Sequence, residues 1–197
     1  INDSVRVQEQ VTDAPLAGKG VLVVGGSGKM GEWMCRFLSN RGAEVKTWDP
    51  RGRLPGYAEE KSLAHAAKSA DIVVVASPLG AAPQELKQVL GASPRGLVFD
   101  LCSVKSHISS MLRKAAADGF RITSVHPMFG PRAPSPNGLN VLVCDCGCDE
   151  ANREAAEKML SERLGLVVKL EPDPAEFSIL LSNPDVATKA LFELGQA

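Results

Sequence analysis

Short apolar runs and amphipathic segments alternate along most of the chain. Residues 21–24 and 72–75 are unbroken apolar runs, which are typical of strands in a parallel sheet covered on both faces. Between residues 29 and 41 the apolar side chains recur at helical spacing, and Gly42 stands where a helix commonly ends. Strands that alternate with helices in this way predict a doubly wound α/β fold with a mostly parallel sheet.

The same criteria predict further elements up to residue 170. Helices are predicted over residues 62–69, 83–90, 106–118 and 150–164, and strands over residues 43–48, 71–76, 96–100, 122–125, 140–144 and 166–170. Ligands of doubly wound sheets bind beyond the carboxyl ends of the strands. Four polar residues lie at or just past such ends, so we expect them near one ligand: Asp49, Ser77, Ser103 and His126.

A glycine-rich sequence connects the first predicted strand to the first predicted helix. It runs Gly26, Ser27, Gly28, Lys29, Met30, Gly31 and has the G-x-G-x-x-G spacing of dinucleotide-binding Rossmann-type folds. The first glycine permits a tight turn, the second lets a pyrophosphate approach the backbone, and the third allows close packing of helix on strand. The helix start offers free N–H groups and a positive dipole to the phosphates. We expect these six residues, with Ser77 and Pro78, to bind the cofactor; the alternative is a glycine turn that binds no nucleotide.

Asp49 closes the second predicted strand, about twenty residues after the glycine motif. A carboxylate at this place accepts hydrogen bonds from the ribose hydroxyls of NAD and repels the 2′-phosphate of NADP. Arg51 and Arg53 follow, and either could hold that phosphate or extend into solvent. We predict NAD as the cofactor, with NADP as the alternative, and expect Asp49 and Arg51 to line its site.

The composition narrows the classes of function. The 22 basic and 23 acidic residues give a net charge of −1 and form no long run of one sign, which argues against a nucleic acid or an anionic membrane as partner. No apolar stretch reaches the roughly 18 residues of a membrane span, and the amino terminus lacks a signal-peptide pattern, so we expect a cytoplasmic protein. Cys144, Cys146 and Cys148 have no second pair of ligands in the sequence, so we expect small apolar strand-end residues and no metal.

A second motif lies on the substrate side of the predicted sheet. His126 follows a strand and opens the sequence His-Pro-Met-Phe-Gly-Pro at residues 126–131. Histidine exchanges a proton near neutral pH, as the oxidation of an alcohol by a nicotinamide requires. Together with the glycine motif and the sequence Asp-Leu-Cys-Ser-Val-Lys at residues 100–105, this motif resembles the prephenate dehydrogenase family from about residue 21 to residue 170.

The resemblance implies oxidative decarboxylation of prephenate or of a close analogue such as arogenate or 4-amino-4-deoxyprephenate. In the family, the serine and histidine of these motifs face the C4 hydroxyl of the substrate, which makes Ser103 and His126 the expected catalytic residues. His126 would take the hydroxyl proton while hydride leaves C4, and Ser103 would orient both groups. From the residues alone, Ser103 also fits a helix N-cap, and His126 also fits a packed histidine at a strand end.

The chain departs from the family after its predicted sheet. Family members usually continue into a helical domain that forms a homodimer and supplies an arginine for the ring carboxylate, whereas residues 172–197 contain no arginine. We expect a lead-in over residues 1–17, a dinucleotide-binding domain over residues 18–171 and a remnant of the helical domain over residues 172–197. The missing wall of the site is expected to come from a second chain or from residues outside this sequence. Arg132 and Lys105 are the candidate substrate-binding residues. The alternatives are a nucleotide-binding module without turnover and a β-hydroxyacid- or imine-type dehydrogenase on the same fold.

Overall fold

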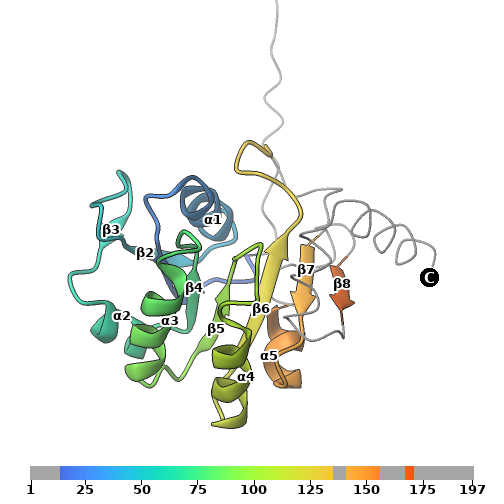
Figure 1. Cartoon of the computed structure of the whole chain (residues 1–197). Helices are drawn as coiled ribbons and strands as arrows, with labels where there is room; N and C mark the ends of the chain where they lie inside the picture. The colour runs from blue at the N-terminus through green and yellow to red at the C-terminus, as the bar shows by residue number, and fades with distance from the viewer. Residues whose placement is uncertain (1–13, 135–140, 156–166, 171–197) are drawn as a thin grey trace, which may run out of the picture.

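One sheet of eight strands runs through the computed structural model, which describes residues 14–134, 141–155 and 167–170 (Figure 1). The strands are β1 (Gly20–Val24), β2 (Glu44–Trp48), β3 (Ala58–Glu59), β4 (Ile72–Val75), β5 (Leu97–Asp100), β6 (Ile122–Pro127), β7 (Val141–Cys144) and β8 (Val167–Leu170). The helices are α1 (Lys29–Ser39), α2 (Leu63–Ser69), α3 (Ala82–Gly91), α4 (Ser109–Ala117) and α5 (Asp149–Glu154).

The sheet is doubly wound. Its order is β3-β2-β1-β4-β5-β6-β7-β8, and neighbouring strands are parallel except β6 and β7, which are antiparallel. The chain builds outward from β1 to one edge and then returns to add β4 on its other side. A crevice at such a reversal is the usual ligand site of this architecture. The predicted mostly parallel, Rossmann-type sheet is confirmed.

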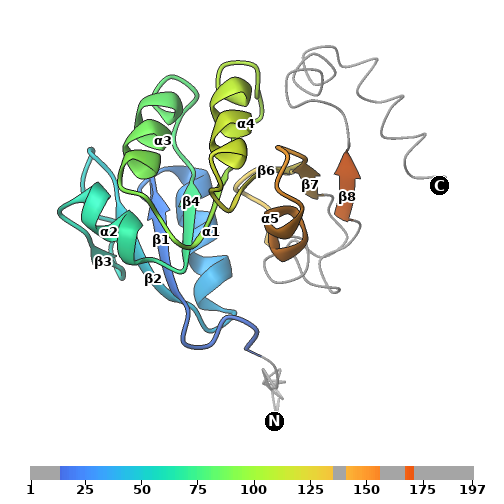
Figure 2. The ribbon, with the colours of Figure 1, turned by 90° about the horizontal axis from the view of Figure 1, so that it is seen from below.

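Helices cover both faces of the sheet. One face packs against α1 and α5, and the other against α2, α3 and α4; Figure 2 shows α3 and α4 on the side opposite α1. Successive residues of β1 alternate between the two cores: Val21 and Val23 belong to the first, Leu22 and Val24 to the second. Because both faces are buried, the central strands are apolar at every position rather than at every second one.

Three element boundaries differ from the prediction in ways that concern the site. β6 extends through Pro127, so His126 lies inside the strand. α4 begins at Ser109, three residues later than predicted. Leu16, at the end of the predicted lead-in, is buried in the core and its N–H donates to the carbonyl oxygen of Arg41 at 3.0 Å. Residues 1–13 and 171–197, which hold most of the predicted lead-in and the predicted helical remnant, lie outside the described residues.

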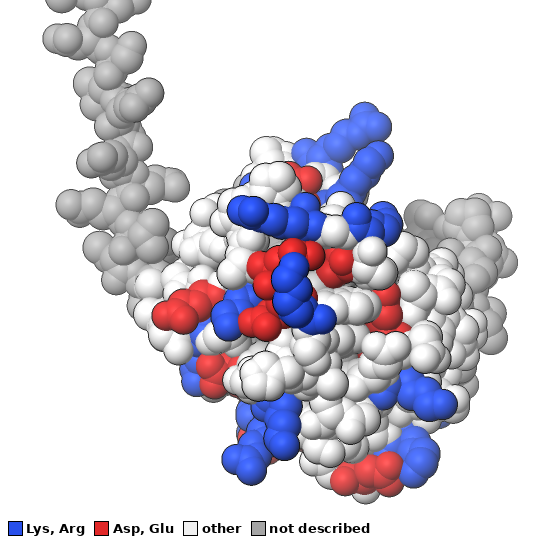
Figure 3. All heavy atoms as spheres, turned by 90° about the vertical axis from the view of Figure 1, so that its left-hand side faces the viewer, with Lys and Arg blue, Asp and Glu red and all other residues white. Residues whose placement is uncertain are grey.

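Acidic and basic side chains are interspersed on the face at the β3 edge of the sheet (Figure 3). Two ion pairs lie in this region, Lys46 with Glu60 at 2.7 Å and Lys61 with Glu59 at 3.1 Å. Exposed pairs of this kind contribute little to stability. Within the described ranges, no helix is long and apolar enough to cross a membrane.

Candidate functional site

The glycine-rich turn between β1 and α1 is closely packed. Gly25 has a φ of +77°, which glycine adopts without strain. A side chain on Gly31 would overlap the carbonyl oxygen of Gly25, and one on Gly26 would collide with Thr47 of β2. The tight turn therefore falls on Gly25, one residue before the position predicted, and Gly26 is required by the approach of β2. Gly31 has its predicted role of bringing the helix close to the turn.

The amino end of α1 opens toward a cavity at the carboxyl edge of the sheet. Gly28 is the N-cap residue and forms no side-chain capping bond, and the first helical hydrogen bond runs from Glu32 N to Gly28 O at 2.8 Å. The N–H groups of the first turn therefore have no acceptor within the helix and can bind an anion. The cavity has a volume of about 330 Å³ and brings together residues predicted from separate segments: Lys29, Met30, Arg51, Ser77, Pro78 and Ser103.

Asp49 directly follows β2, and its carboxylate is engaged within the protein. Oδ1 accepts hydrogen bonds from Arg51 N at 2.9 Å and Arg51 Nε at 3.1 Å, and Oδ2 accepts from Ser27 N at 3.1 Å and Arg51 Nη2 at 3.0 Å. Burial alone would raise the pKa of this carboxyl, but the hydrogen bonds and charge of Arg51, with the Ser27 N–H, hold the pKa below its ordinary value.

These four bonds fill the acceptor positions of a carboxylate. The ribose hydroxyls that the sequence assigns to Asp49 can therefore reach it only when Arg51 moves aside. The Arg51 side chain is 57% exposed and can turn outward into solvent, whereas the Asp49 side chain is only 2% exposed and has no such freedom.

Ser77 lies just past β4, beneath the glycine turn. The residue is buried and lines the cavity, and its Oγ has no hydrogen-bond partner among the described residues. A buried hydroxyl without a partner is unfavourable. Ser77 is therefore suited to bind a polar group of a ligand in the cavity.

His126 lies in β6, opposite Leu142 of the antiparallel strand β7. The residue is half-buried. Burial, reinforced by the charge of Lys105 and opposed by that of Asp100, lowers the pKa of the imidazole from 6.5 to about 4. The side chain is therefore neutral at pH 7, which is the form that can accept a proton.

Ser103 is exposed in the turn between β5 and α4 and lines the cavity. Since α4 begins at Ser109 with Ile108 as its N-cap, the alternative that Ser103 caps this helix is wrong. β5 and β6 are neighbours and pair through Asp100 and Ser124. Ser103 and His126 thus follow this pair on two adjacent strands, at the same edge of the sheet.

Lys105 does not face the cavity, which corrects its assignment to substrate binding. Its side chain is completely buried, and Nζ donates to Asp100 Oδ1 at 2.8 Å and to the carbonyl oxygen of Val125 at 3.1 Å. Ser124 Oγ donates to the other carboxylate oxygen, Asp100 Oδ2, at 2.6 Å. The sequence reasoning missed Asp100 and Ser124; the available signal was an aspartate that ends an apolar strand five residues before a lysine.

The loop after β6 is anchored to α1. Trp33 Nε1 donates to the carbonyl oxygen of Ala133 at 2.8 Å, and its ring lies 4.9 Å from the ring of Phe129, centroid to centroid. Arg132 in this loop is exposed. Helical spacing marked Trp33 as apolar but gave no sign of this contact.

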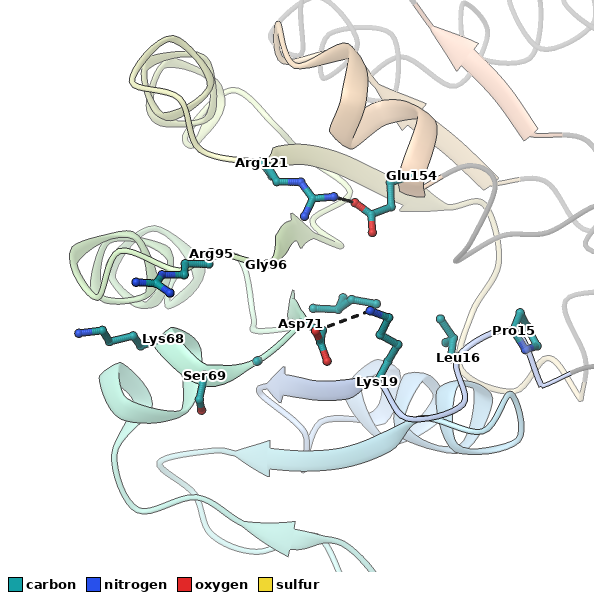
Figure 4. Close-up of a pocket in the computed structure, with 12 residues that line it drawn as sticks. Pro15, Leu16, Lys19, Lys68, Ser69, Asp71, Arg95, Gly96, Arg121 and Glu154 are labelled. Carbon is teal, nitrogen blue, oxygen red and sulfur yellow. Dashed lines mark hydrogen bonds and ion pairs between the residues drawn. The ribbon is translucent and has the colours of Figure 1, made fainter.

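A larger cavity, of about 600 Å³, opens at the opposite edge of the sheet (Figure 4). In its lining, Lys19 pairs with Asp71 at 3.7 Å and Arg121 pairs with Glu154. Helix α2 ends at this wall, and Lys68 in its last turn complements the negative end of the helix dipole. No predicted site residue lines this cavity. The smaller cavity, which several predicted site residues line, is therefore the candidate site.

The three clustered cysteines do not continue along one strand. Cys144 ends β7, Cys146 lies in the following turn, and Cys148 is the N-cap of α5. Burial raises the pKa of the Cys144 thiol to about 12, which keeps it protonated at neutral pH. Across the described part of the chain, no group of three or more histidine, cysteine, aspartate or glutamate side chains is arranged to hold a metal ion.

The middle of the chain matches a known protein family. Residues 54–145 match the family model for the nucleotide-binding domain of prephenate dehydrogenase, a segment that includes Ser77, Ser103 and His126 and begins after the glycine motif. A probable arogenate/prephenate dehydrogenase of Methanocaldococcus jannaschii is 32% identical over 124 residues, 58% of this chain and 28% of that protein. The T-protein of Enterobacter agglomerans is 30% identical over 126 residues, 64% of this chain and 31% of that protein. The chain thus spans less than a third of the length of these relatives.

Solved structures share the fold. An imine reductase variant from Myxococcus stipitatus, in complex with NAD+, has a TM-score of 0.68 at 16% identity and covers 90% of this chain and 63% of its own. The 3-hydroxyisobutyrate dehydrogenase of Mycobacterium tuberculosis has a TM-score of 0.66 at 22% identity, covering 82% of this chain and 57% of its own. At these identities the likeness concerns the fold alone.

Proposed function

Because residues 54–145 match the nucleotide-binding domain of prephenate dehydrogenase, we propose that the protein belongs to this family and that it oxidises and decarboxylates prephenate or a close cyclohexadienyl analogue, with NAD(P) as hydride acceptor. One observation carries the proposal. An exposed Ser103 lines the cavity of the glycine turn, and a neutral His126, which does not line the cavity itself, lies on the neighbouring strand at the same edge of the sheet.

The cavity fits the pyrophosphate of a dinucleotide. The glycine turn leaves room that a Cβ would fill, the first turn of α1 presents uncapped N–H groups, and the Ser77 hydroxyl lacks a partner among the described residues. Asp49 and Arg51 stand at the ribose end. Once Arg51 moves aside, Asp49 can accept hydrogen bonds from ribose hydroxyls, which supports NAD as the preferred form.

The proposed substrates carry a hydroxyl or an amino group at C4 and a carboxylate on the opposite ring carbon. NAD(P), held by the glycine turn, would supply the acceptor for the hydride that leaves C4. His126 takes the proton of the C4 hydroxyl, and the O–H electrons form the second bond of a C4 carbonyl. The bond between the ring and its carboxylate then breaks, carbon dioxide leaves, and the released electrons make the ring aromatic. The imidazolium returns its proton to the ring oxygen, so the histidine is regenerated.

Ser103 and Arg132 have separate proposed tasks. Ser103 orients the C4 hydroxyl toward the imidazole, which is a positioning role rather than a nucleophilic one. Arg132, exposed in the loop that Trp33 anchors, is the candidate for a substrate carboxylate. We propose that a second copy of the chain completes the site as a homodimer. Sedimentation of the fully active protein as a monomer contradicts this part.

Turnover measurements on prephenate, arogenate and the 4-amino analogue, each with NAD and NADP, test the proposal. In the active pairing, His126→Asn should lower turnover by roughly 10²- to 10⁴-fold with unchanged nucleotide affinity, since asparagine keeps a polar contact but cannot accept a proton. Ser103→Ala should lower it less. His65→Asn on the exposed side of α2 is the matched control and should leave turnover intact.

Three outcomes contradict the proposed function. A His126→Asn protein with near-native turnover removes the proposed base. An unaltered protein that binds nucleotide but turns over no dienol substrate indicates a binding module. Activity on β-hydroxy acids or imines instead indicates a different dehydrogenase on this fold.

A further inference from the structure

A buried ion pair lies under the two proposed catalytic residues. Lys105 and Asp100 have no exposed surface, and their Nζ and Oδ1 atoms are 2.8 Å apart. Removing two charges from water is costly, and buried pairs can often be replaced by apolar side chains without loss of stability. Stability alone is therefore a poor reason for a pair at this depth, next to the proposed site.

The pair connects the turn that carries Ser103 to the strand that carries His126. On the turn, the N–H of Cys102 donates to Asp100 Oδ1 at 2.8 Å, and Lys105 closes the same segment. On β6, Ser124 Oγ donates to Asp100 Oδ2 at 2.6 Å. Lys105 Nζ also donates, at 3.1 Å, to the carbonyl of the residue directly before His126. Each of these hydrogen bonds joins residues that lie within three positions of Ser103 or His126 in the chain.

We propose that the Lys105–Asp100 pair positions the proton acceptor of the site: it fixes the β5–α4 turn, which carries Ser103, to β6, which carries His126, and it holds a buried ammonium against the backbone next to His126. This inference rests on the proposed function for its catalytic meaning. The hydrogen bond from the ammonium to the carbonyl next to His126 does not depend on which substrate is bound.

The charges around His126 act in opposite directions. Lys105, from the turn, disfavours a second positive charge and lowers the pKa of His126, whereas Asp100, from β5, raises it; the effect of Lys105 is the larger of the two. β7, on the other side of β6, places Leu142 opposite His126 and contributes the protonated thiol of Cys144. Loss of Lys105 therefore removes the opposing charge and leaves an uncompensated carboxylate nearby.

The test is an NMR titration of the His126 imidazole in the 197-residue chain without substrate, with the resonance assigned by its absence in His126→Asn. In Lys105→Met the pKa of His126 should rise from about 4 toward 6.5. In the double variant Lys105→Met/Asp100→Asn it should rise less, because both charges are gone. The double variant leaves no unpaired buried charge, so it carries the test where the single variant fails to fold.

Two controls separate charge from structure. Lys46→Met breaks an exposed ion pair with Glu60 on another part of the sheet and should leave the titration unchanged. Ser124→Ala removes the hydrogen bond to Asp100 without removing a charge, so it should shift the His126 titration far less than Lys105→Met does. A His126 titration that is unchanged within error in both Lys105 variants overturns the inference.

Turnover adds a readout that a purely structural role would not move. If the ammonium keeps the imidazole neutral, the acidic limb of kcat/KM should move to higher pH in Lys105→Met, and by a smaller amount in the double variant. A uniform loss of turnover at every pH, with no movement of the limb, contradicts the electrostatic role. Failure of the proposed function would appear differently, as absence of dienol turnover in a protein whose His126 titration still responds to Lys105.

Discussion

Replacement of His126 should change how the stability of the protein depends on pH. The pKa of His126 is about 4 in the folded chain, because partial burial of the imidazole and the charge of Lys105 lower it, and it returns to 6.5 on unfolding. Between these values the unfolded chain binds a proton that the folded chain does not. The free energy of unfolding therefore falls as the pH falls, and this loss begins near pH 6.5 and is complete below about pH 4.

The size of the effect follows from the two pKa values. A change from 6.5 to about 4 corresponds to about 3 kcal/mol over the whole range. Between pH 7 and pH 5, carboxyl groups are largely ionised and contribute little. Over this interval the same linkage relation gives a loss of about 2 kcal/mol in the free energy of unfolding. Asparagine binds no proton, so His126→Asn should lose about 2 kcal/mol less than the native chain over this interval.

Urea unfolding at pH 7, 6 and 5, followed by tryptophan fluorescence, measures this difference. The quantity of interest is the change with pH, so a constant offset between the two proteins does not affect it. His65→Asn is the control, because this imidazole is exposed on α2 and its curve should run parallel to the native one. Parallel curves for native and His126→Asn proteins would refute the conclusion that the fold holds His126 neutral.

Three further outcomes follow from the glycine turn, the carboxylate at β2 and the charge of the substrate. Gly31→Ala should destabilise the chain by about 1–3 kcal/mol and weaken nucleotide binding, whereas Gly91→Ala, with open space around it, should stabilise it by roughly 0.4–1 kcal/mol in urea unfolding. NAD should bind more tightly than NADP in calorimetric titration. Asp49→Ala should narrow that preference, and Arg51→Ala, which frees the carboxylate, should widen it. Tighter binding of NADP to the unaltered chain contradicts the assignment of NAD as the preferred cofactor. Because an anionic substrate favours a protonated imidazole, the acidic limb of kcat should lie at higher pH than that of kcat/KM, and coincident limbs would show that the substrate charge does not reach His126.

The central elements of the fold could be predicted because their sequence signals are local. The run at residues 72–75 is apolar at every position, and the structure places it as the fully buried strand β4. The glycine motif has a fixed spacing relative to the strand and helix that flank it, and α1 begins at Lys29 as the spacing predicts. The two-residue strand β3 was missed because so short a segment has no period to detect.

The parts that could not be predicted depend on contacts between distant segments. His126 lies inside β6 because β7 returns antiparallel beside it, and no local pattern at residues 122–127 announces that partner. Arg51 closes over Asp49 through contacts that also involve the glycine turn. The residues around Lys105 in the sequence predict an exposed loop position. Its side chain is nevertheless buried, because Nζ donates to the Asp100 carboxylate and to the Val125 carbonyl, which come from strands β5 and β6 of the sheet.

The depressed pKa of His126 has two opposing consequences for the proposed reaction. An imidazole that stays neutral at pH 7 is always in the form that accepts a proton, but a lower pKa also makes it a weaker base. The buried ammonium of Lys105 pushes in this direction in the free protein, and the carboxylates of a dienol substrate push the other way once they enter the site. Under the proposed function, the base therefore gains proton affinity when an anionic substrate lies beside it. In this proposal, a buried positive charge near the proton acceptor is compatible with catalysis, because the carboxylates of the bound substrate raise the pKa of His126 again.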